Sequence, residues 1–323
     1  MSSNVRFSGE IIRILDRKCL HCHSNDGLAM PLSNYRDVRS WGRAIREEIV
    51  EQRMPPWSAA RGYRRFQNEL ALTSREATTI LSWLDGGMPR GDDRDLPKPS
   101  PPAAVKRPDL QLTVTPQRVP ALDDRIVRRV SVDTNLDVDR AIARVVVNPG
   151  HRSVLRAALV FVGDPDREGR WLGAWLPWQH EIAPPERSAF RLPARARLTV
   201  ELHYRGGERE TTDQPTIDLF FAPDPRQSVD DVIAAAASPL RMTSSSTIWA
   251  ILPSADSATK SMELTARRPN GSTEVLLWIP ELRHEWPQAL VLQDPVTMPA
   301  GTTVSLVAHP LGAVARARVS IVK

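Results

Sequence analysis

Apolar residues recur at helical spacing over residues 9 to 95 and predict a small α-helical domain at 1–88. Two segments carry an apolar stripe, one made of Ile11, Ile12, Ile14 and Leu15, the other of Val38, Trp41, Ile45 and Ile49. A further helix is predicted to begin after Thr73, where Thr73 and Glu76 have the spacing of a capping box, and to end at Gly86-Gly87. We therefore expect three helices in this domain.

The composition changes at residues 89–108, which are rich in proline and carry the acidic pair Asp92-Asp93. Proline fixes its own backbone angle and donates no N–H, so such a stretch forms neither a helix nor a central strand. We expect a semi-rigid extended linker and a domain boundary here. The prolines are Pro89, Pro97, Pro99, Pro101, Pro102 and Pro108.

Beyond the linker the apolar pattern is that of short strands bounded by Pro, Gly and Asp. The first set is Arg125–Val132, Ala141–Val147, Leu155–Val162, Ala196–Tyr204 and Thr216–Phe221. After a predicted break near Asp224–Ser238, the second set is Thr247–Leu252, Ser261–Ala266, Thr273–Ile279, Ala289–Gln293, Thr302–Ala308 and Ala315–Val322. Pro269-Asn270-Gly271 is typical of a hairpin turn. We expect two antiparallel β-sandwiches, at 109–228 and 229–323, and thus a multidomain α plus all-β chain.

The candidate chemistry of the helical domain lies in Cys19-Leu20-His21-Cys22-His23, which has the C-x-x-C-H pattern of covalent attachment of a c-type haem. Cys19 and Cys22 would form the thioethers and His23 would ligate the iron. Cys19 and Cys22 are the only two cysteines of the chain. A redox or zinc C-x-x-C is the alternative, but zinc requires two further Cys or His ligands nearby. His21, between the two tethered cysteines, is poorly placed for the iron.

A second axial ligand is offered by Arg53-Met54-Pro55-Pro56-Trp57, where two prolines stiffen the loop behind the thioether of Met54. His/Met ligation raises the reduction potential and suits electron transfer. Met30, in Ala29-Met30-Pro31-Leu32, is the rival ligand, and either methionine could instead fill the core. We expect Trp57 to pack beside the porphyrin. Trp41, Trp57 and Trp83 are interpreted as core and haem-wall residues.

Composition adds limits on the partners of the chain. The 323 residues have a net charge of +5 and 41% hydrophobic residues, which is ordinary for a globular protein of two or three domains. No run of Lys or Arg is interleaved with stacking aromatics, so nucleic acid is not expected as a partner. A basic face suits an acidic redox partner protein, alone or within a larger membrane-associated electron-transfer complex.

No apolar run approaches the roughly 20 residues of a membrane span. The N-terminal Met1-Ser2-Ser3-Asn4 does not show the charged and apolar regions of a signal peptide. Covalent haem attachment nevertheless takes place outside the bacterial cytoplasmic membrane. We therefore expect a periplasmic protein on chemical grounds.

These motifs, together with Tyr35, Trp41 and Ser82-Trp83-Leu84-Asp85-Gly86-Gly87, resemble the cytochrome c module fused to bacterial relatives of copper type II, ascorbate-dependent monooxygenases. The C-terminal part resembles the monooxygenase module, the fold of peptidylglycine α-hydroxylating and dopamine β-monooxygenases. This resemblance implies two jelly-roll-like sandwiches with one copper each. It is specific in the first domain and looser in the second.

The copper ligands that the resemblance implies are largely missing. The first copper would take an adjacent His-His pair, where this chain has Arg156 and Ala157, plus the histidine of a His-Tyr dipeptide, which is His203. The second would take a His-x-His after Leu-Pro, where Ser254 and Asp256 stand. The family's distal methionine segment has no counterpart after His309-Pro310. One imidazole near an arginine does not hold copper, because affinity requires several converging ligands. The remaining histidines are interpreted as surface or hydrogen-bonded residues: His151, His180, His284 and His309.

Two functions from different classes follow. The first is a periplasmic electron carrier with one covalent haem c and no copper, in which the β-module is a degenerate, non-catalytic docking scaffold. The second is a haem-fed copper-dependent monooxygenase with atypical ligands. Loss of both copper ligand sets favours the first, since sites and not folds carry function. Haem-based gas sensing would need an open axial position, which Met54 opposes.

Overall fold

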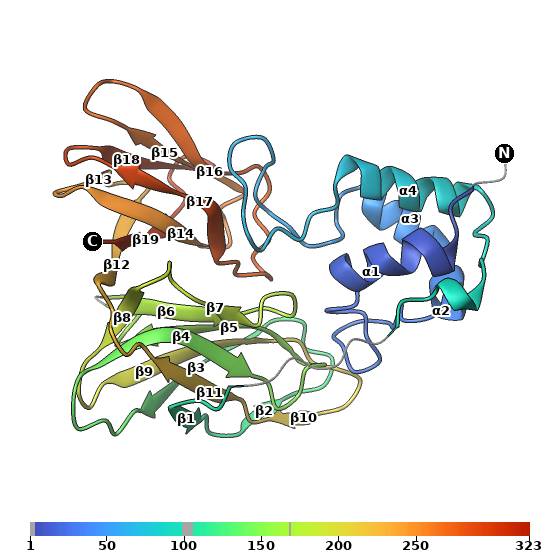
Figure 1. The fold of residues 1–323 in the computed structure, drawn as a ribbon, viewed down its shortest axis with the longest axis horizontal. Helices are drawn as coiled ribbons and strands as arrows, with labels where there is room; N and C mark the ends of the chain where they lie inside the picture. The colour runs from blue at the N-terminus through green and yellow to red at the C-terminus, as the bar shows by residue number, and fades with distance from the viewer. Residues whose placement is uncertain (1–3, 99–105, 168) are drawn as a thin grey trace. The chain divides into compact units, whose positions relative to one another are not determined.

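The computed structural model describes residues 4–98, 106–167 and 169–323, which separate into two compact units (Figure 1). The helical unit comprises Met1–Trp57, Leu70–Arg107 and Arg152–Val154. The β-unit comprises Ser58–Glu69, Pro108–His151 and Leu155–Lys323. The chain is mostly β-sheet with a small helical part, as the hydrophobic pattern predicts.

The described residues of the helical unit form four α-helices where three were predicted. The middle predicted helix is divided at Trp41, whose backbone leaves helical geometry. The predicted capping box is confirmed: the Glu76 N–H donates to Thr73 Oγ1 at 3.1 Å and the Thr73 N–H donates to Glu76 Oε2 at 2.9 Å. The elements are the π-helical turn η1 (Phe7–Ile11), α1 (Ile12–Lys18), α2 (Tyr35–Ser40), α3 (Gly42–Val50), α4 (Ser74–Asp85) and the 3-10 turn η2 (Asp93–Asp95).

The core of the helical unit forms around Phe7, which contacts the ring of Tyr35 edge-on at 5.5 Å between centroids and Trp83 at 6.2 Å. Trp83 is fully buried, as predicted, whereas Trp41 is 44% exposed and is not a core residue. The apolar stripe of α1 is buried in the same cluster, which consists of Phe7, Ile11, Ile12, Ile14, Leu15, Leu32, Val38, Ile45, Ile80 and Trp83.

The first residues of the predicted linker pack against the helical unit. The Phe7 N–H donates to the Pro89 carbonyl at 3.0 Å and the Ser8 N–H to the Arg90 carbonyl at 2.9 Å. Trp83 Nε1 also donates to the Pro89 carbonyl, at 3.0 Å. Proline lacks an N–H donor but keeps its carbonyl acceptor, which explains why a proline-rich stretch can still be held in this way. Pro99, Pro101 and Pro102 lie outside the described residues.

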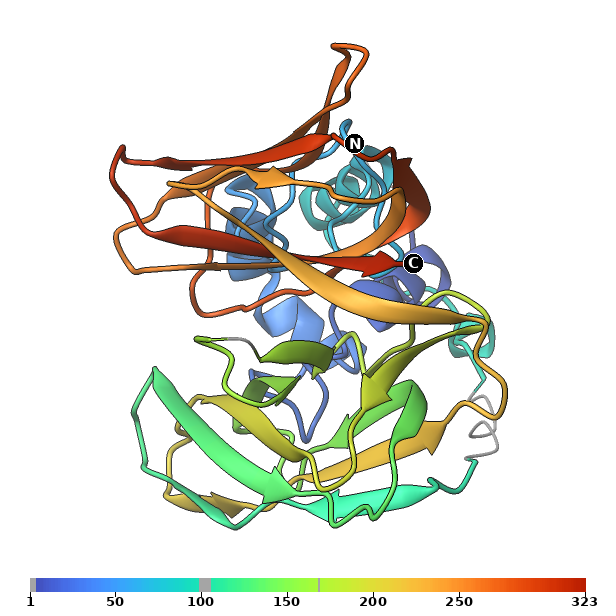
Figure 2. The same cartoon turned by 90° about the vertical axis from the view of Figure 1, so that its left-hand side faces the viewer.

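The first sandwich of the β-unit has two facing layers, drawn in green to gold in Figures 1 and 2. One layer follows the order β1-β11-β4-β8, with β7 beside β4, and the other follows β3-β9-β5-β6. A separate pair joins β10 to β2. The strands are β1 (Leu110–Thr113), β2 (Gln117–Val119), β3 (Ile126–Asp133), β4 (Arg140–Asn148), β5 (Leu155–Val162), β6 (Arg170–Trp175), β7 (Glu181–Ile182), β8 (Ser188–Leu192), β9 (Arg197–Tyr204), β10 (Thr211–Asp213) and β11 (Thr216–Phe221).

The second sandwich, in orange to red, pairs β12-β19-β14-β17 with a four-stranded sheet of order β13-β18-β15-β16. Its strands are β12 (Gln227–Ala235), β13 (Leu240–Arg241), β14 (Ser246–Ala255), β15 (Ser261–Arg267), β16 (Thr273–Ile279), β17 (Leu290–Met298), β18 (Thr303–His309) and β19 (Ala315–Val322). The hairpin at 269–271 is confirmed: Gly271 has φ +86°, and β15 pairs antiparallel with β16.

The predicted break near Asp224–Ser238 is wrong, because β12 runs through it and links the sheets of the two sandwiches. Residues 227–229 pair in parallel with β8, and residues 229–235 pair antiparallel with β19. The acidic pair of this strand is partnered within the β-unit: Asp230 is paired with Lys323 Nζ at 3.1 Å, and Asp231 accepts a hydrogen bond from the Trp171 N–H at 2.6 Å.

Residues 58–69, expected within the domain at 1–88, belong to the β-unit and lie along the edge strand β17. Phe66 forms an antiparallel bridge with Leu292, and the Gln67 N–H donates to the Val291 carbonyl at 2.8 Å. The Asn68 side chain donates to the Ala289 carbonyl at 2.7 Å and accepts from the Val291 N–H at 3.1 Å. We call Ser58–Glu69 the strap. It supplies hydrogen-bond partners to an edge that would otherwise be unpaired there.

No helix within 4–98, 106–167 or 169–323 is both long and apolar enough to cross a membrane.

Candidate functional site

The predicted haem-attachment motif forms a compact turn directly after α1. Cys19 is the residue that ends the helix, and its N–H donates to the Leu15 carbonyl at 2.7 Å. The Cys19 carbonyl in turn accepts from the Cys22 N–H at 3.1 Å and from the His23 N–H at 3.0 Å. Both cysteines are in the thiol form, and Cys22 and His23 are 9% and 8% exposed. The end of α1 therefore carries two thiols and two imidazoles, those of His21 and His23, within five residues.

His23 is held by one ring nitrogen. Its Nδ1 lies 2.8 Å from the Met30 carbonyl oxygen, which can only accept, so Nδ1 carries the proton and donates. This hydrogen bond leaves Nε2 as the nitrogen with a lone pair, the form that a metal ligand requires. Burial lowers the pKa of His23, although the hydrogen bond to Met30 opposes this shift. A neutral imidazole is thus favoured at position 23.

The Cys19 thiol does not have the lowered pKa that is typical of a redox C-x-x-C pair. Burial raises the pKa of the Cys19 thiol to about 12, and the nearby Glu76 carboxylate adds to the effect. Thiol exchange and zinc binding both use the thiolate, which reactive C-x-x-C motifs favour by lowering the pKa. The raised pKa of Cys19 therefore disfavours thiol exchange at this position.

The two candidate axial methionines differ in their surroundings. Met30 contacts His23 through its backbone carbonyl. Met54 follows α3 with its N–H donating to the Glu48 carbonyl at 3.2 Å, and 38% of the residue is exposed. Of the residues after Met54, Pro56 is buried and Trp57 is partly buried. Met54 as distal ligand and Trp57 as a packing residue stay predictions.

Gly27 shapes the turn after the C-x-x-C-H motif, although the motif itself does not include it. A Cβ at this position would lie 2.2 Å from the Cys22 carbonyl oxygen, so only glycine fits. The close approach lets the Ala29 N–H donate to the Cys22 carbonyl at 3.1 Å and the Leu32 N–H to the His23 carbonyl at 2.8 Å. The only sequence signal for this role is a glycine a few residues after a cofactor motif, which is common in any loop.

The positions of the first implied copper do not form a ligand set. Arg156 donates from Nη1 to the Asp124 carbonyl at 3.1 Å, and its guanidinium lies 5.6 Å from the ring centre of Trp286. Ala157 is fully buried and pairs with His203 across β5 and β9. Of these three positions, only His203 has a side chain that could bind a metal.

The positions of the second implied copper are also without imidazoles. Asp256 accepts from the Thr259 hydroxyl at 2.8 Å and from the Val314 N–H at 3.2 Å, in a turn after β14. Ser254 and His203 line one cavity, which opens between the two sandwiches of the β-unit. Among the described residues, no three His, Cys, Asp or Glu side chains are grouped to hold a metal ion. The residues present therefore do not fit a copper centre.

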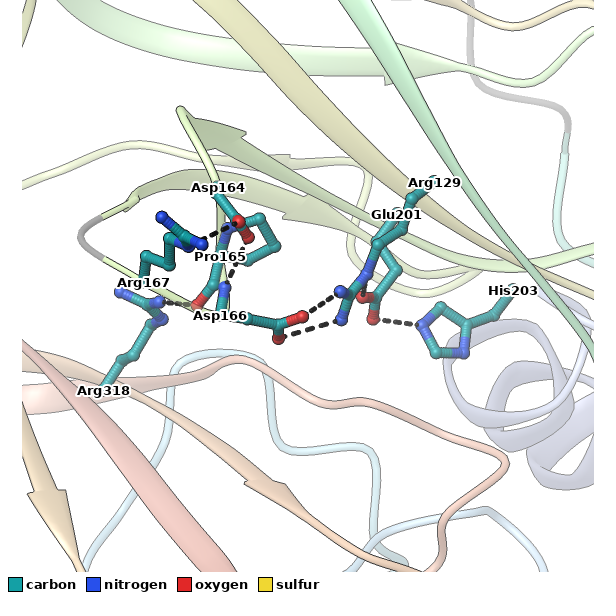
Figure 3. Close-up of polar contacts among 8 residues, drawn as sticks. All are labelled: Arg129, Asp164, Pro165, Asp166, Arg167, Glu201, His203 and Arg318. Carbon is teal, nitrogen blue, oxygen red and sulfur yellow. Dashed lines mark hydrogen bonds and ion pairs between the residues drawn. The ribbon is translucent and has the colours of Figure 1, made fainter.

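His203 belongs instead to an ionic network at this cavity (Figure 3). Its Nε2 lies 2.8 Å from Glu201 Oε1, and Arg129 Nε lies 2.7 Å from Glu201 Oε2. Arg129 also contacts Asp166 through two of its nitrogens. Burial raises the pKa of Glu201, but the hydrogen bonds from His203 and Arg129 outweigh it and leave the pKa below its ordinary value. Glu201 is therefore an anion that orients the imidazole.

Two of the remaining histidines are hydrogen-bonded, as predicted. His180 Nε2 lies 2.8 Å from the Pro177 carbonyl oxygen and His284 Nε2 lies 2.8 Å from the Thr259 carbonyl oxygen. His284 also lines the cavity. His309 ends β18.

Comparisons with known proteins add no family. No protein-family model matches the chain, and no curated protein matches it. Among solved structures, the major capsid protein P2 of bacteriophage PM2 is similar at 10% identity and TM-score 0.27, covering 66% of this chain and 97% of that one. The PBSX exported protein XepA has 7% identity and TM-score 0.23, over 68% and 89%. Bacillus subtilis oxalate decarboxylase has 7% identity and TM-score 0.15, over 70% and 80%. Likenesses this weak support no statement about the activity of this chain.

Proposed function

We propose that this chain is a periplasmic monohaem c-type cytochrome that carries electrons, with its β-unit as a copper-free, jelly-roll-like docking scaffold. The observation that carries the proposal is the geometry of His23. Its Nδ1 donates to the Met30 carbonyl at 2.8 Å, and the two cysteines sit in the turn that ends α1. This donor set fits a covalently attached haem better than it fits zinc or thiol exchange.

The residues have distinct roles in this proposal. Cys19 and Cys22 would hold the haem through thioethers, and His23 Nε2 would ligate the iron. Met54 would supply the second axial ligand, with Trp57 packed beside the porphyrin. The bound haem supplies one-electron chemistry between ferric and ferrous iron, at a potential raised by His/Met ligation. The hydrogen bond to the Met30 carbonyl orients the imidazole.

The first experiment measures iron and copper per chain, on protein made with c-type haem maturation, offered copper and then desalted. We expect one iron and no copper. Stoichiometric copper would instead support the haem-fed monooxygenase, to be tested with ascorbate and oxygen. Absence of covalent haem would refute the cytochrome assignment.

The distal ligand is tested with a matched pair of variants. Met54→Ala should abolish the low-spin His/Met spectrum, because it removes the thioether from the iron. Met30→Ala should retain that spectrum, since it keeps the backbone carbonyl that holds His23. The reverse pattern would assign the distal position to Met30.

A further inference from the structure

The cavity in the β-unit has a volume of about 190 Å³ and takes no part in the proposed electron transfer. It is slightly larger than the ~150 Å³ cavity that accommodates a benzene ring. One part of its wall is apolar and comes from both sandwiches. The apolar residues are Leu159, Phe161, Leu252, Ile279, Trp286 and Leu290. Such a wall suits the hydrocarbon part of a small organic molecule.

The polar part of the wall contains a guanidinium that already binds a carboxylate in two-pronged fashion. Arg129 contacts Asp166 through Nη1 and Nη2, the second at 3.2 Å from Asp166 Oδ1 (Figure 3). Both residues line the cavity. This parallel arrangement is the geometry in which arginine recognises carboxylates. Asp166 thus shows which chemical group this face of Arg129 accepts.

Asp166 is held weakly compared with the other partner of Arg129. Its side chain is 64% exposed, whereas the Glu201 side chain is 13% exposed and is also bound by His203. Exposed ion pairs contribute little net free energy, because water and salt screen them. A carboxylate supplied by a ligand can therefore replace Asp166 charge for charge, while Glu201 keeps Arg129 in place.

The loop that carries Asp166 has a second anchor, which does not depend on that side chain. Arg318 of β19 is 8% exposed and donates to the Gly169 carbonyl at 2.5 Å and to the Pro165 carbonyl. The Asp164 carbonyl accepts from the Gly169 N–H at 2.8 Å and closes the base of the loop. The Asp166 side chain can leave Arg129 while the backbone beside the cavity stays in place.

We propose that this cavity binds a small organic carboxylate of about the size of benzoate. The carboxylate of the ligand takes the place of Asp166 on Arg129, and its hydrocarbon part packs against the apolar wall. Glu201 contacts both His203 Nε2 and Arg129 Nε, so it keeps these two side chains in place beside the ligand. Nothing in this site involves the haem motif, so its ligand binding is independent of the proposed electron transfer.

The test is isothermal titration of the full haem-loaded chain with benzoate and with neutral benzamide. We expect benzoate to bind with one site per chain and benzamide at least about ten-fold more weakly, because charge-assisted hydrogen bonds are lost. Equal binding of the two probes, or no binding of benzoate to wild type and to Asp166→Asn, would overturn the proposal.

Two variants should change the affinity for benzoate in opposite directions. Asp166→Asn removes the internal competitor and should tighten benzoate binding by roughly two- to five-fold, the range expected for an exposed ion pair. Arg129→Gln should weaken it by at least about ten-fold. The control is Asp139→Asn. Asp139 is exposed, lies 2.9 Å from Arg191 Nη2 and does not line the cavity, so this variant should leave the affinity for benzoate unchanged. Weaker benzoate binding by Asp166→Asn would contradict the proposal that Asp166 and the ligand compete for Arg129.

A fourth variant keeps every charge of the network. Ser254 is exposed and lines the cavity, so Ser254→Trp should fold and fill the space that the ligand needs. We expect loss of benzoate binding with the unfolding temperature retained. Wild-type affinity in Ser254→Trp would place the ligand elsewhere and overturn the proposal, even if Arg129→Gln failed to fold.

Discussion

The helical unit and the β-unit hold their histidines in different ways. His23 donates from Nδ1 to a neutral backbone carbonyl seven residues away, which leaves Nε2 with its lone pair. His203 contacts the Glu201 carboxylate through Nε2, and that carboxylate is bound to Arg129 from another strand. The first imidazole keeps a lone pair on Nε2, which the proposed haem ligation requires, whereas the second is part of a salt-bridge network. The same residue type therefore has different hydrogen-bond partners in the two units.

The largest expected effect separates these two histidines. His23→Ala should abolish the low-spin haem spectrum, because no other imidazole in the motif is placed to replace Nε2. His203→Ala should leave the spectrum unchanged and lower the stability of the β-unit by ~1–3 kcal/mol, since the largely buried Glu201 loses a partner. Absorption spectra and thermal unfolding of both variants measure these effects. A changed haem spectrum in His203→Ala would contradict the comparison.

The second prediction tests whether the strap belongs to the β-unit. Phe66 is 5% exposed and bridges Leu292, so Phe66→Ala should destabilise the β-unit by ~3–5 kcal/mol through the cavity it leaves. Tyr63, in the same segment, is 52% exposed, and Tyr63→Ala is the matched control with an effect within about 0.5 kcal/mol. Tryptophan fluorescence during denaturation reports the β-unit, because most tryptophans lie there. Equal losses of stability in the two variants would show that the strap does not contribute to the core of the β-unit.

What the sequence predicts well is local. The C-x-x-C-H turn and the capping box of Thr73 and Glu76 depend on residues within five positions, and the box is present as predicted. Strands with a regular apolar pattern, such as Leu155–Val162 and Thr273–Ile279, have the bounds expected from that pattern. In these segments the propensity of each residue agrees with the final fold, so a short window is sufficient.

What the sequence does not predict is set by distant partners. The strap has no strand pattern of its own and takes its position from β17. The break predicted near Asp224–Ser238 is instead the strand β12, whose Asp230 and Asp231 have distant partners in Lys323, Trp171 and Arg318. The cavity network is likewise built from β3, the loop after β5, β9 and β19. No spacing rule links Arg129, Asp166 and Glu201 before the topology is known.

The third prediction concerns Asp231 and pH. Burial raises its pKa to about 6, although the Trp171 N–H and Arg318 oppose this shift. The folded chain therefore keeps this proton when the unfolded chain, with an ordinary pKa near 3.8, releases it. Stability contributed by Asp231 is present below about pH 4 and is lost as pH rises to about 6.

Asp231→Asn isolates this effect because asparagine does not titrate and can still accept from the Trp171 N–H. The unfolding free energy of wild type relative to the variant should fall by about 2–3 kcal/mol between pH 4 and 6.5. Denaturant titrations of both proteins across that pH range measure the difference. A difference that rises with pH would mean that the ion pair with Arg318, 4.0 Å away, dominates the burial of Asp231.

The smallest expected change in stability is in the helical unit and concerns a local contact, the capping box of α4. Thr73→Ala removes the Oγ1 acceptor of the Glu76 N–H and should lower stability by ~1 kcal/mol. The matched control is Thr79→Ala, later in α4. Thr79 donates to the Arg75 carbonyl within the helix, and alanine has the higher helix propensity, so this change should be neutral or stabilising.

The capping box also links α4 to the C-x-x-C-H motif. Glu76 lies 3.3 Å from Arg17 of α1 and raises the pKa of Cys19. Unfolding followed by haem absorption should therefore detect Thr73→Ala, whereas the tryptophan signal of the β-unit should stay unchanged.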